Sequence, residues 1–260
     1  MKTLTMSLLF VFAFAFLTAD AYAIKDDSLM LYLPFEEGSG NVTTDLSGNK
    51  IQGELKGAKF SKDGKFGGCV SFATGTDYIE FPAADQLNIT DQLTMEAWIF
   101  PEQSQADSSV LGRRSGPNVG GYCMQWHATD PNKPAVEAFV YVNGSWAQNG
   151  TRDKQKGSSE LKKWHHAAIT FDGNNLKQYI DGNLDATVAI SGKINSVKEV
   201  FRVGQAQTTL TSMIGSVDEV AIYKKALSEN EILEDMEKGV VFPVSPAGRL
   251  VATWGMIKGE

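Results

Sequence analysis

The sequence contains little cysteine and histidine, has fewer bases than acids, and lacks any long apolar run after its first two dozen residues. Its 260 residues include 2 Cys and 3 His, and no Cys or His spacing typical of zinc ligands occurs. With 24 Lys and Arg against 31 Asp and Glu, the net charge is −7. This charge argues against binding to nucleic acid, which needs a cationic surface. The 14 Phe, 7 Tyr and 5 Trp exclude a largely disordered chain.

The one long apolar run lies at the N-terminus. Lys2 precedes LLFVFAFAFL at residues 8–17, and Ala21-Tyr22-Ala23 follows with a small-x-small pattern. These features predict a signal peptide over residues 1–23, because the run is shorter than the ~20 residues that span a bilayer. The mature chain is therefore expected to be secreted, periplasmic or on the cell surface, with no membrane span after cleavage.

Two cysteines in an exported chain leave two readings open. Cys69 and Cys123 each lie in a strand-like run, GGCVSF and GYCMQW. They either form a disulfide or are small buried hydrophobic residues.

After residue 28, short alternating segments are separated by Gly, Asn and Asp at intervals of about ten residues, which predicts an all-β antiparallel sandwich. Hairpin turns are expected at residues 172–175 and 181–183. One short helix should begin near Leu227, where Ser228 and Glu231 form a capping box. The strands are expected at 29–35, 69–72, 78–81, 93–100, 122–127, 136–142, 164–171, 176–180, 186–190, 201–203 and 216–223.

The last segment, residues 240–260, is interrupted by Pro and Gly and is expected to be a tail. Trp254 within it either packs on the sandwich or docks a protein partner. The chain is thus divided into a signal peptide (1–23), one domain (24–239) and a tail (240–260).

Several motifs occur in a characteristic order: LYLPFEEGSG, DLSGN, GKFGGCVSF, LTMEAWIFP, KKWHHAAITFDGNNLKQYIDG and IGSVDEVAIYKKALSENEI. Over about residues 28–236 the chain resembles the bacterial laminin-G-like jelly-roll domains of the concanavalin A-like lectin and glucanase superfamily. The resemblance implies a jelly-roll β-sandwich. It does not choose a function, because jelly rolls host lectins, glycosidases and adhesion modules.

Carboxylates arranged for glycoside hydrolysis are missing. Retaining enzymes of the laminarinase type in this superfamily carry two Glu on one strand face, and no E-x-D-x-x-E or E-x-D-x-E run occurs here. Glu96 lacks a partner two residues away on its strand. His165 and His166 are adjacent in one strand and point to opposite faces, so they cannot act on one ligand together. We therefore expect no catalytic activity.

The resemblance implies one structural calcium ion, because related jelly rolls hold one near the first strand and the last long strand. The corresponding residues here are Asp218, with Asp45 and Glu37 as further ligands. The alternative is that Asp218 and Asp45 only cap turns through backbone amides.

Alternation in the strand at residues 136–142 places Glu137, Phe139 and Tyr141 on the face opposite its aliphatic residues. Aromatic rings on an outer sheet face can stack on sugars, so a binding surface is predicted from the concave sheet and its rim. The alternative is that these aromatic side chains pack under loops. The predicted ligand-binding residues are Trp98, Phe139, Tyr141 and Tyr179 on the sheet, with Tyr122 or Trp126 nearby, and Trp146 and Arg114 in the rim loops 101–121 and 143–161, which also carry Arg113 and Arg152.

The sequence favours an exported, non-catalytic carbohydrate-binding or adhesion module with calcium and a cell-surface glycan as partner. The alternatives are a structural or protein-binding surface domain and a glycoside hydrolase.

Overall fold

The structure is a computed structural model. It describes residues 27–103, 105–106, 108–115, 120–127, 135–146, 160–207 and 210–240, together with the backbone of residues 21–23 and 242–244. Only the backbone of Ser115 and Trp146 is described. The one helix of appreciable length in this part, α2 (Glu229–Lys238), is too short and too polar to span a membrane.

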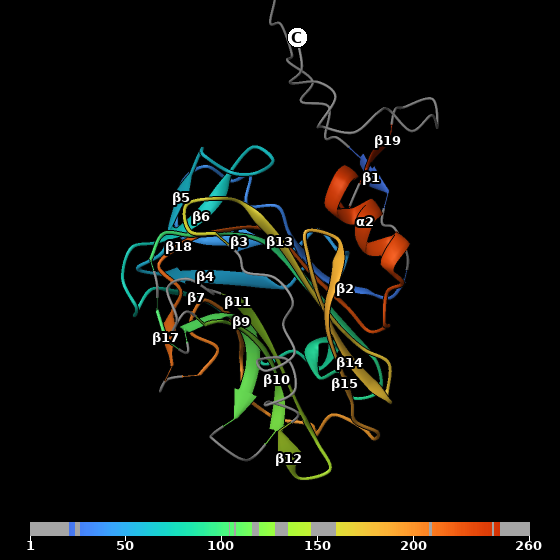
Figure 1. Ribbon diagram of the computed structural model, residues 1–260. Helices are drawn as coiled ribbons and strands as arrows, with labels where there is room; N and C mark the ends of the chain where they lie inside the picture. The colour runs from blue at the N-terminus through green and yellow to red at the C-terminus, as the bar shows by residue number, and fades with distance from the viewer. Residues whose placement is uncertain are drawn as a thin grey trace, which may run out of the picture.

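Two sheets pack face to face (Figure 1), as the alternating pattern predicted. Every pairing within them is antiparallel except that of the short strand β17 with β9. Sheet 1 has the order β12 (Ser145–Trp146), β11 (Ala135–Val142), β10 (Gly120–His127), β9 (Ser108–Ser115), β16 (Phe201–Val203), β7 (Tyr78–Phe81), β4 (Gln52–Lys56) and β3 (Val42–Thr44), with β17 (Thr211–Ser212) beside β9. Sheet 2 has the order β15 (Asn183–Ala189), β14 (Asn175–Ile180), β13 (His165–Phe171), β8 (Leu93–Pro101), β18 (Gly215–Tyr223), β6 (Cys69–Phe72) and β5 (Lys59–Ser61), with β2 (Leu29–Leu33) beside β18.

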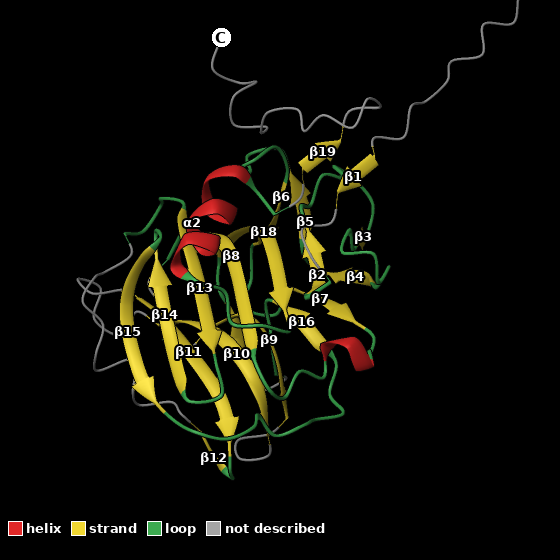
Figure 2. Cartoon of the chain, turned by 90° about the vertical axis from the view of Figure 1, so that its right-hand side faces the viewer, coloured by secondary structure: helices red, strands yellow, loops and turns green. Residues whose placement is uncertain are grey.

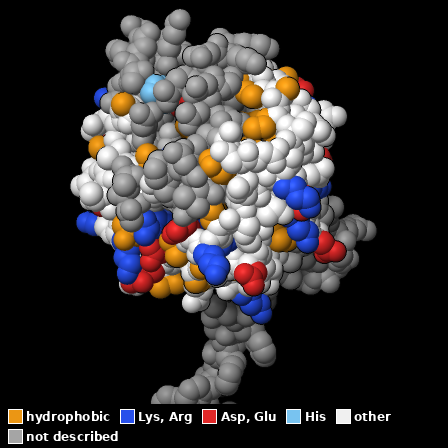
Figure 3. Space-filling view, turned by 90° about the horizontal axis from the view of Figure 1, so that it is seen from below, with side chains coloured by type: hydrophobic (Ala, Val, Ile, Leu, Met, Phe, Trp, Pro, Cys, Tyr) orange, Lys and Arg blue, Asp and Glu red, His pale blue; other side chains and the backbone are white. Residues whose placement is uncertain are grey.

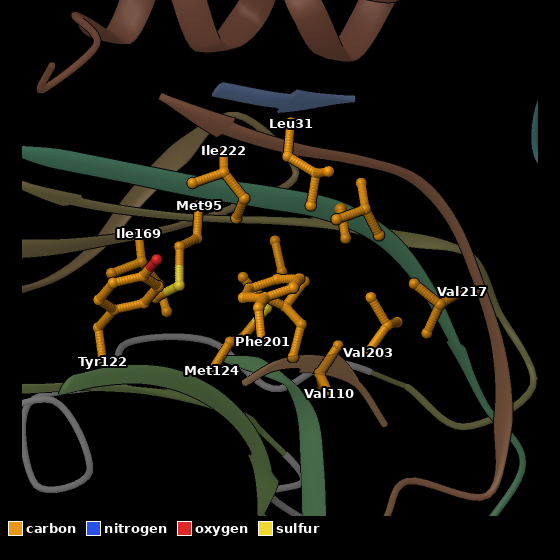
Figure 4. Close-up of a cluster of buried hydrophobic side chains, with 14 of the residues drawn as sticks. Leu31, Met95, Val110, Tyr122, Met124, Ile169, Phe201, Val203, Val217 and Ile222 are labelled. Carbon is orange, nitrogen blue, oxygen red and sulfur yellow. The ribbon is translucent and has the colours of Figure 1, made fainter. Parts of the chain in front are cut away.

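The main core lies between the two sheets. Figure 4 shows Met95, Ile169 and Ile222 of sheet 2 pointing toward Tyr122 and Phe201 of sheet 1. Each strand contributes every second side chain to this layer, because successive side chains of a strand point to opposite faces. Burying a side chain of this size contributes roughly 1.5–3 kcal/mol, so the interlocked faces supply most of the stability.

A second apolar cluster forms where α2 lies against the outer face of sheet 2 (Figure 2). The predicted capping box is present, since the Ser228 side chain accepts from the Glu231 amide and Glu231 accepts from the Ser228 amide. Ile232 is the fully buried apolar residue of this helix, and it packs near Tyr179, Tyr223 and Ala168. The helix therefore covers one end of the sheet.

The predicted hairpins are confirmed. β13 and β14 are joined at residues 172–174, where Asp172 accepts from the amides of Asn174 and Asn175. β14 and β15 are joined through Asp181 and Gly182 at φ 49° and 76°. Both angles lie in the left-handed region that two-residue hairpins require and that Gly and Asp tolerate.

The expected long loop 101–121 is wrong, because β9 occupies residues 108–115 in the middle of sheet 1. Its sequence, SSVLGRRS, has too few apolar residues in alternation to be recognised. Arg113 is buried and donates to the carbonyls of Ala84 and Val197, so it is not a rim residue. The strands β3, β4, β5, β12 and β17 were also missed, and all of them are short and at least partly polar.

The backbone of Ala21–Ala23 forms a short strand, β1, paired with β19 (Phe242–Val244). These are the residues after which signal cleavage is predicted. The apolar run 8–17 and Trp254 lie outside the described residues.

Cys69 and Cys123 are both free and buried. Cys69 lies in sheet 2 and Cys123 in sheet 1, each on the parity of its strand that faces away from the main core. Two sheets separate them, so the structure excludes a disulfide between them.

Unfolding the unreduced protein should therefore expose two thiols per chain that a chromogenic thiol reagent can titrate. The folded protein should react slowly, because burial raises the pKa of each thiol to about 11. A count of zero thiols would contradict this arrangement.

Candidate functional site

The outer face of sheet 1 carries a set of polar and aromatic side chains on β9, β10 and β11. On β11, Val136, Ala138, Val140 and Val142 enter the core, which leaves Glu137, Phe139 and Tyr141 on the outer face as predicted. On β10, Tyr122, Met124 and Trp126 enter the core, so Cys123, Gln125 and His127 share the outer face. Tyr122 and Trp126 are therefore core residues and not neighbours of a binding surface.

Strand register brings these side chains into rows. Gln125 lies opposite Glu137, and Cys123 lies opposite Phe139. Directly opposed residues of antiparallel strands have Cβ atoms about 4.5–5.5 Å apart. Arg114 follows on β9, with its guanidinium carbon 5.8 Å from the centre of the Phe139 ring. We call Arg114, Gln125, Glu137, Phe139 and Tyr141 the sheet 1 cluster.

The sheet 1 cluster is shielded from solvent. Phe139 and Tyr141 are 5% and 6% exposed, and Gln125 and Glu137 are 2% and 1% exposed. Phe139 packs with Cys123 and Ala206, and the Tyr141 hydroxyl donates to the Gly144 carbonyl at 2.8 Å. The two rings are thus not an open stacking platform of the kind predicted. They are covered in the folded protein.

Gln125 was not predicted. Its side chain lies on the outer face of β10, where it is 2% exposed and stands opposite Glu137. A side-chain amide offers an oxygen acceptor and N–H donors, so it can bond to a hydroxyl group in either direction. The only signal in the sequence was its place among the outward positions of β10.

Two predicted residues lie elsewhere. Trp98 and Tyr179 are on the outer face of sheet 2, on the other side of the sandwich from Phe139 and Tyr141. Tyr179 packs beneath α2. Trp98 lies under the connection between β5 and β6, with the Phe66 ring edge-on at 6.1 Å and the Lys65 ammonium 4.1 Å from its ring centre. The prediction that they share one sheet with Phe139 and Tyr141 is therefore wrong.

The remaining predicted rim residue is Trp146. Its backbone in β12 pairs with Tyr141 at the edge of sheet 1, and its side chain lies outside the described residues, as does Arg152.

The three predicted calcium ligands do not form one group. Asp45 is buried and accepts from the amides of Tyr32, Ser47 and Ile51 and from the Ser47 hydroxyl. Glu37 accepts from the Thr43 hydroxyl and the Thr44 amide. Across the residues that the structure describes, no three His, Cys, Asp or Glu side chains are arranged to hold a metal ion. The predicted set does not fit calcium, because the oxygens of Asp45 are already occupied by turn-capping donors.

Asp218 has different surroundings. It is fully buried and accepts from the amides of Phe66 and Glu219. Glu219 follows in a bulge of β18 at φ 52° and accepts from the Tyr32 hydroxyl at 2.6 Å. Burial, together with repulsion from Glu219 and Glu36, raises the pKa of Asp218 to about 8. Burial, together with repulsion from Glu36 and Asp235, raises the pKa of Glu219 to about 7.

Beside this pair lies a buried histidine. His166 stands in β13 with its ring 5.3 Å from that of Trp98 and its Nε2 3.9 Å from a Glu96 carboxylate oxygen. Burial lowers the pKa of His166 to about 4, so it is neutral at pH 7. His165 instead bonds to Asp181 and to the Glu160 carbonyl, so the two histidines serve different contacts, as predicted.

Comparison with known proteins identifies the family to which this fold belongs. The profile of the family described as the "Concanavalin A-like lectin/glucanases superfamily" matches residues 73–233, more than half of the chain. The chain belongs to the concanavalin A-like lectin/glucanase superfamily. A search of curated protein sequences finds no match.

Solved structures share this concanavalin A-like fold. Domain 4 of AbnA, a GH43 extracellular arabinanase from Geobacillus stearothermophilus solved with arabinotriose, superposes with a TM-score of 0.64 at 19% identity, covering 81% of this chain and 98% of that one. The binding domain of Paraclostridial Mosquitocidal Protein 1 gives 0.64 at 16% identity, covering 81% and 52%. Trypanosoma rangeli sialidase gives 0.58 at 16% identity, covering 82% and 33%. The chain thus spans about half the length of the mosquitocidal protein chain and about a third of the sialidase chain. At these identities the likeness establishes the fold.

Some members of the superfamily are glucanases, so the spacing of carboxylates matters. On the outer face of sheet 1, Glu137 stands on β11, and Glu80 stands on β7, four strands away and in the row of Phe139. Four strand spacings amount to about 19 Å. Glycosidases hold their two carboxyl groups about 5–10 Å apart. Glu80 is also paired with Arg202 at 2.6 Å, so the described residues of this face offer no hydrolytic pair.

Proposed function

We propose that this concanavalin A-like chain is an exported, non-catalytic carbohydrate-binding module whose ligand occupies the sheet 1 cluster. The Gln125 amide opposite the Glu137 carboxylate, on the same face as the Phe139 and Tyr141 rings, is the observation that supports the proposal. Sugars need this combination, because an amide and a carboxylate orient hydroxyl groups while ring faces contact the apolar side of a pyranose or furanose.

The burial of the cluster selects the kind of glycan. A flat row of exposed rings suits the middle of a long polysaccharide chain. Side chains that are shielded from solvent and lie on three neighbouring strands suit a chain end or a short oligosaccharide, because sites for small ligands enclose most of the ligand. Arg114 adds a cation that can donate to ring or hydroxyl oxygens at the border of the cluster.

A structural calcium ion is retained as a proposal only at Asp218, because there a second buried carboxylate, Glu219, repels it, whereas Asp45 and Glu37 serve as turn caps. Calcium bound there would supply positive charge beside two buried carboxylates.

Removing the Gln125 amide should weaken glycan binding. A glycan array that includes arabino-oligosaccharides identifies the ligand, and calorimetry should then show at least tenfold weaker binding for Gln125→Ala and Arg114→Ala, corresponding to about 1.4 kcal/mol. Gln52→Ala is the matched control, since Gln52 is exposed on β4 at the other end of the same sheet. Absence of any glycan signal would overturn the proposal in favour of a protein-binding domain. Accumulation of reducing ends during incubation would overturn its non-catalytic part.

A further inference from the structure

A second row of side chains crosses the outer face of sheet 2, on the opposite side from the sheet 1 cluster. Strand register places Lys59 opposite Ser71, Ser71 opposite Ser216, and Ser216 opposite Phe100. Trp164, directly before β13, continues the row, with its ring centre 5.5 Å from that of Phe100. At about 4.8 Å per strand, the row is about 19 Å long. We call it the sheet 2 strip.

The strip is open, whereas the next row is closed. Lys59 is exposed, and Ser71, Ser216, Phe100 and Trp164 are all partly exposed. The neighbouring residues two positions along each strand are all buried: Cys69, Asp218, Trp98 and His166. The connection between β5 and β6, through Lys65 and Phe66, lies over Trp98 and so forms a side wall of the strip.

Unpaired positive charge surrounds the strip. Lys59, Lys62, Lys65 and Lys162 are exposed, and none of the four forms an ion pair with a described residue. Of the acids nearby, Glu160 pairs with Lys163, and Asp63 accepts from the Ser61 hydroxyl and keeps its charge. The net charge of the chain is −7, and on the face seen in Figure 3 bases lie beside acids. Four exposed ammonium groups around one row, against the one charged carboxylate of Asp63, are therefore a local feature.

Protection of a sheet edge explains only part of this. Lysine on an edge strand such as β5 discourages pairing with another chain, which accounts for Lys59. It does not account for Lys62, Lys65 and Lys162, which lie outside the strands, or for a partly exposed pair of aromatic rings in the same row. Together these features match a linear polymer that is both anionic and apolar on one side of each repeat.

We propose that the sheet 2 strip binds a linear anionic polysaccharide with carboxylated sugar units. The Phe100 and Trp164 rings contact sugar faces, Ser71 and Ser216 bond to hydroxyl groups, and the lysines attract the carboxylates. This site is separate from the sheet 1 cluster and does not depend on it. A module with both sites can hold two glycans at once on opposite faces.

The test uses polygalacturonate as the probe in affinity electrophoresis of the full chain. The triple variant Lys59→Glu, Lys62→Glu and Lys65→Glu should bind at least tenfold more weakly, and binding by the unaltered chain should fall steeply as salt rises. A control triple variant, Lys50→Glu, Lys198→Glu and Lys224→Glu, makes the same change in net charge at exposed positions elsewhere and should bind normally. Melting curves confirm that both variants fold.

Two further measurements separate a glycan site from simple ion exchange. Trp164→Ala should weaken polygalacturonate binding about threefold to tenfold and leave its salt dependence unchanged. Gln125→Ala should bind polygalacturonate normally, so the proposal for the sheet 2 strip and the proposal for the sheet 1 cluster can be rejected independently of each other. Equal loss in both triple variants, equally tight binding of dextran sulfate, or an unaffected Trp164→Ala would each overturn the proposal.

Discussion

Raising the pH from about 6.5 to about 8 in calcium-free buffer should lower the melting temperature of the protein. Asp218 and Glu219 have folded pKa values of about 8 and about 7, whereas unfolded Asp and Glu titrate near 4. Between these limits the folded state holds protons that the unfolded state has released. Stability therefore falls as the pH rises, by up to about 1.4 kcal/mol per pH unit for each group.

His166 opposes this effect in the acidic range. Its folded pKa of about 4 lies below the ordinary value of 6.5, so between these values the unfolded state binds the extra proton and stability rises with pH. The two contributions partly cancel from about pH 4 to 6.5. Above that range His166 is neutral in both states, and the fall due to the buried carboxylates should be seen alone.

Asp218→Asn is the decisive variant, because it removes the repulsion between the two carboxylates. It should flatten the melting temperature between pH 6.5 and 8, whereas Glu234→Gln, a change on the exposed side of α2, should leave the slope unchanged. If calcium binds at Asp218, 1 mM calcium should raise the melting temperature at pH 8 more than at pH 5, and a chelator should reverse the gain. A flat profile for the unaltered, chelated protein would contradict the buried charge pair.

Much of the fold was predictable because its signals are local. The strand 136–142 alternates cleanly, and the hairpins at Asp172 and Asp181 use residues that accept positive φ or cap turns. Ser228 and Glu231 lie three positions apart, and this capping-box pattern alone predicts the start of α2. β9 was missed because its place in the middle of sheet 1 depends on two neighbouring strands, and Ser, Gly and Arg dominate its sequence.

The candidate site was predictable only in part. Alternation assigns a face within one strand, and it correctly placed Phe139 and Tyr141 away from the core. It cannot say which sheet a strand joins, because pairing is decided by contacts between distant segments. Trp98 and Phe139 both face outward, yet they stand on opposite sides of the sandwich. Gln125 was recognised only when the structure placed it opposite Glu137 on the outer face of sheet 1.

Replacing Asp45 with Ala should destabilise the protein by roughly 3–5 kcal/mol, the largest effect expected of a single substitution outside the apolar core. Its carboxylate, 3% exposed, accepts from three backbone amides and the Ser47 hydroxyl. Alanine leaves these donors buried without acceptors, at roughly 1–3 kcal/mol for each one that water does not reach. Chemical denaturation, with the change in midpoint read at constant slope, measures the loss.

The same variant separates a turn cap from a metal ligand. Asp45→Asn keeps one acceptor oxygen and should lose about half as much stability as Asp45→Ala. Asp172→Ala removes a similar turn cap near the surface and should cost only about 1 kcal/mol. A turn cap acts with or without metal, so the loss for Asp45→Ala should be equal in calcium and in chelator. A loss of stability that appears only in calcium would show instead that Asp45 binds the ion. The turn that Asp45 caps beside Tyr32 would then have to be stabilised by other contacts.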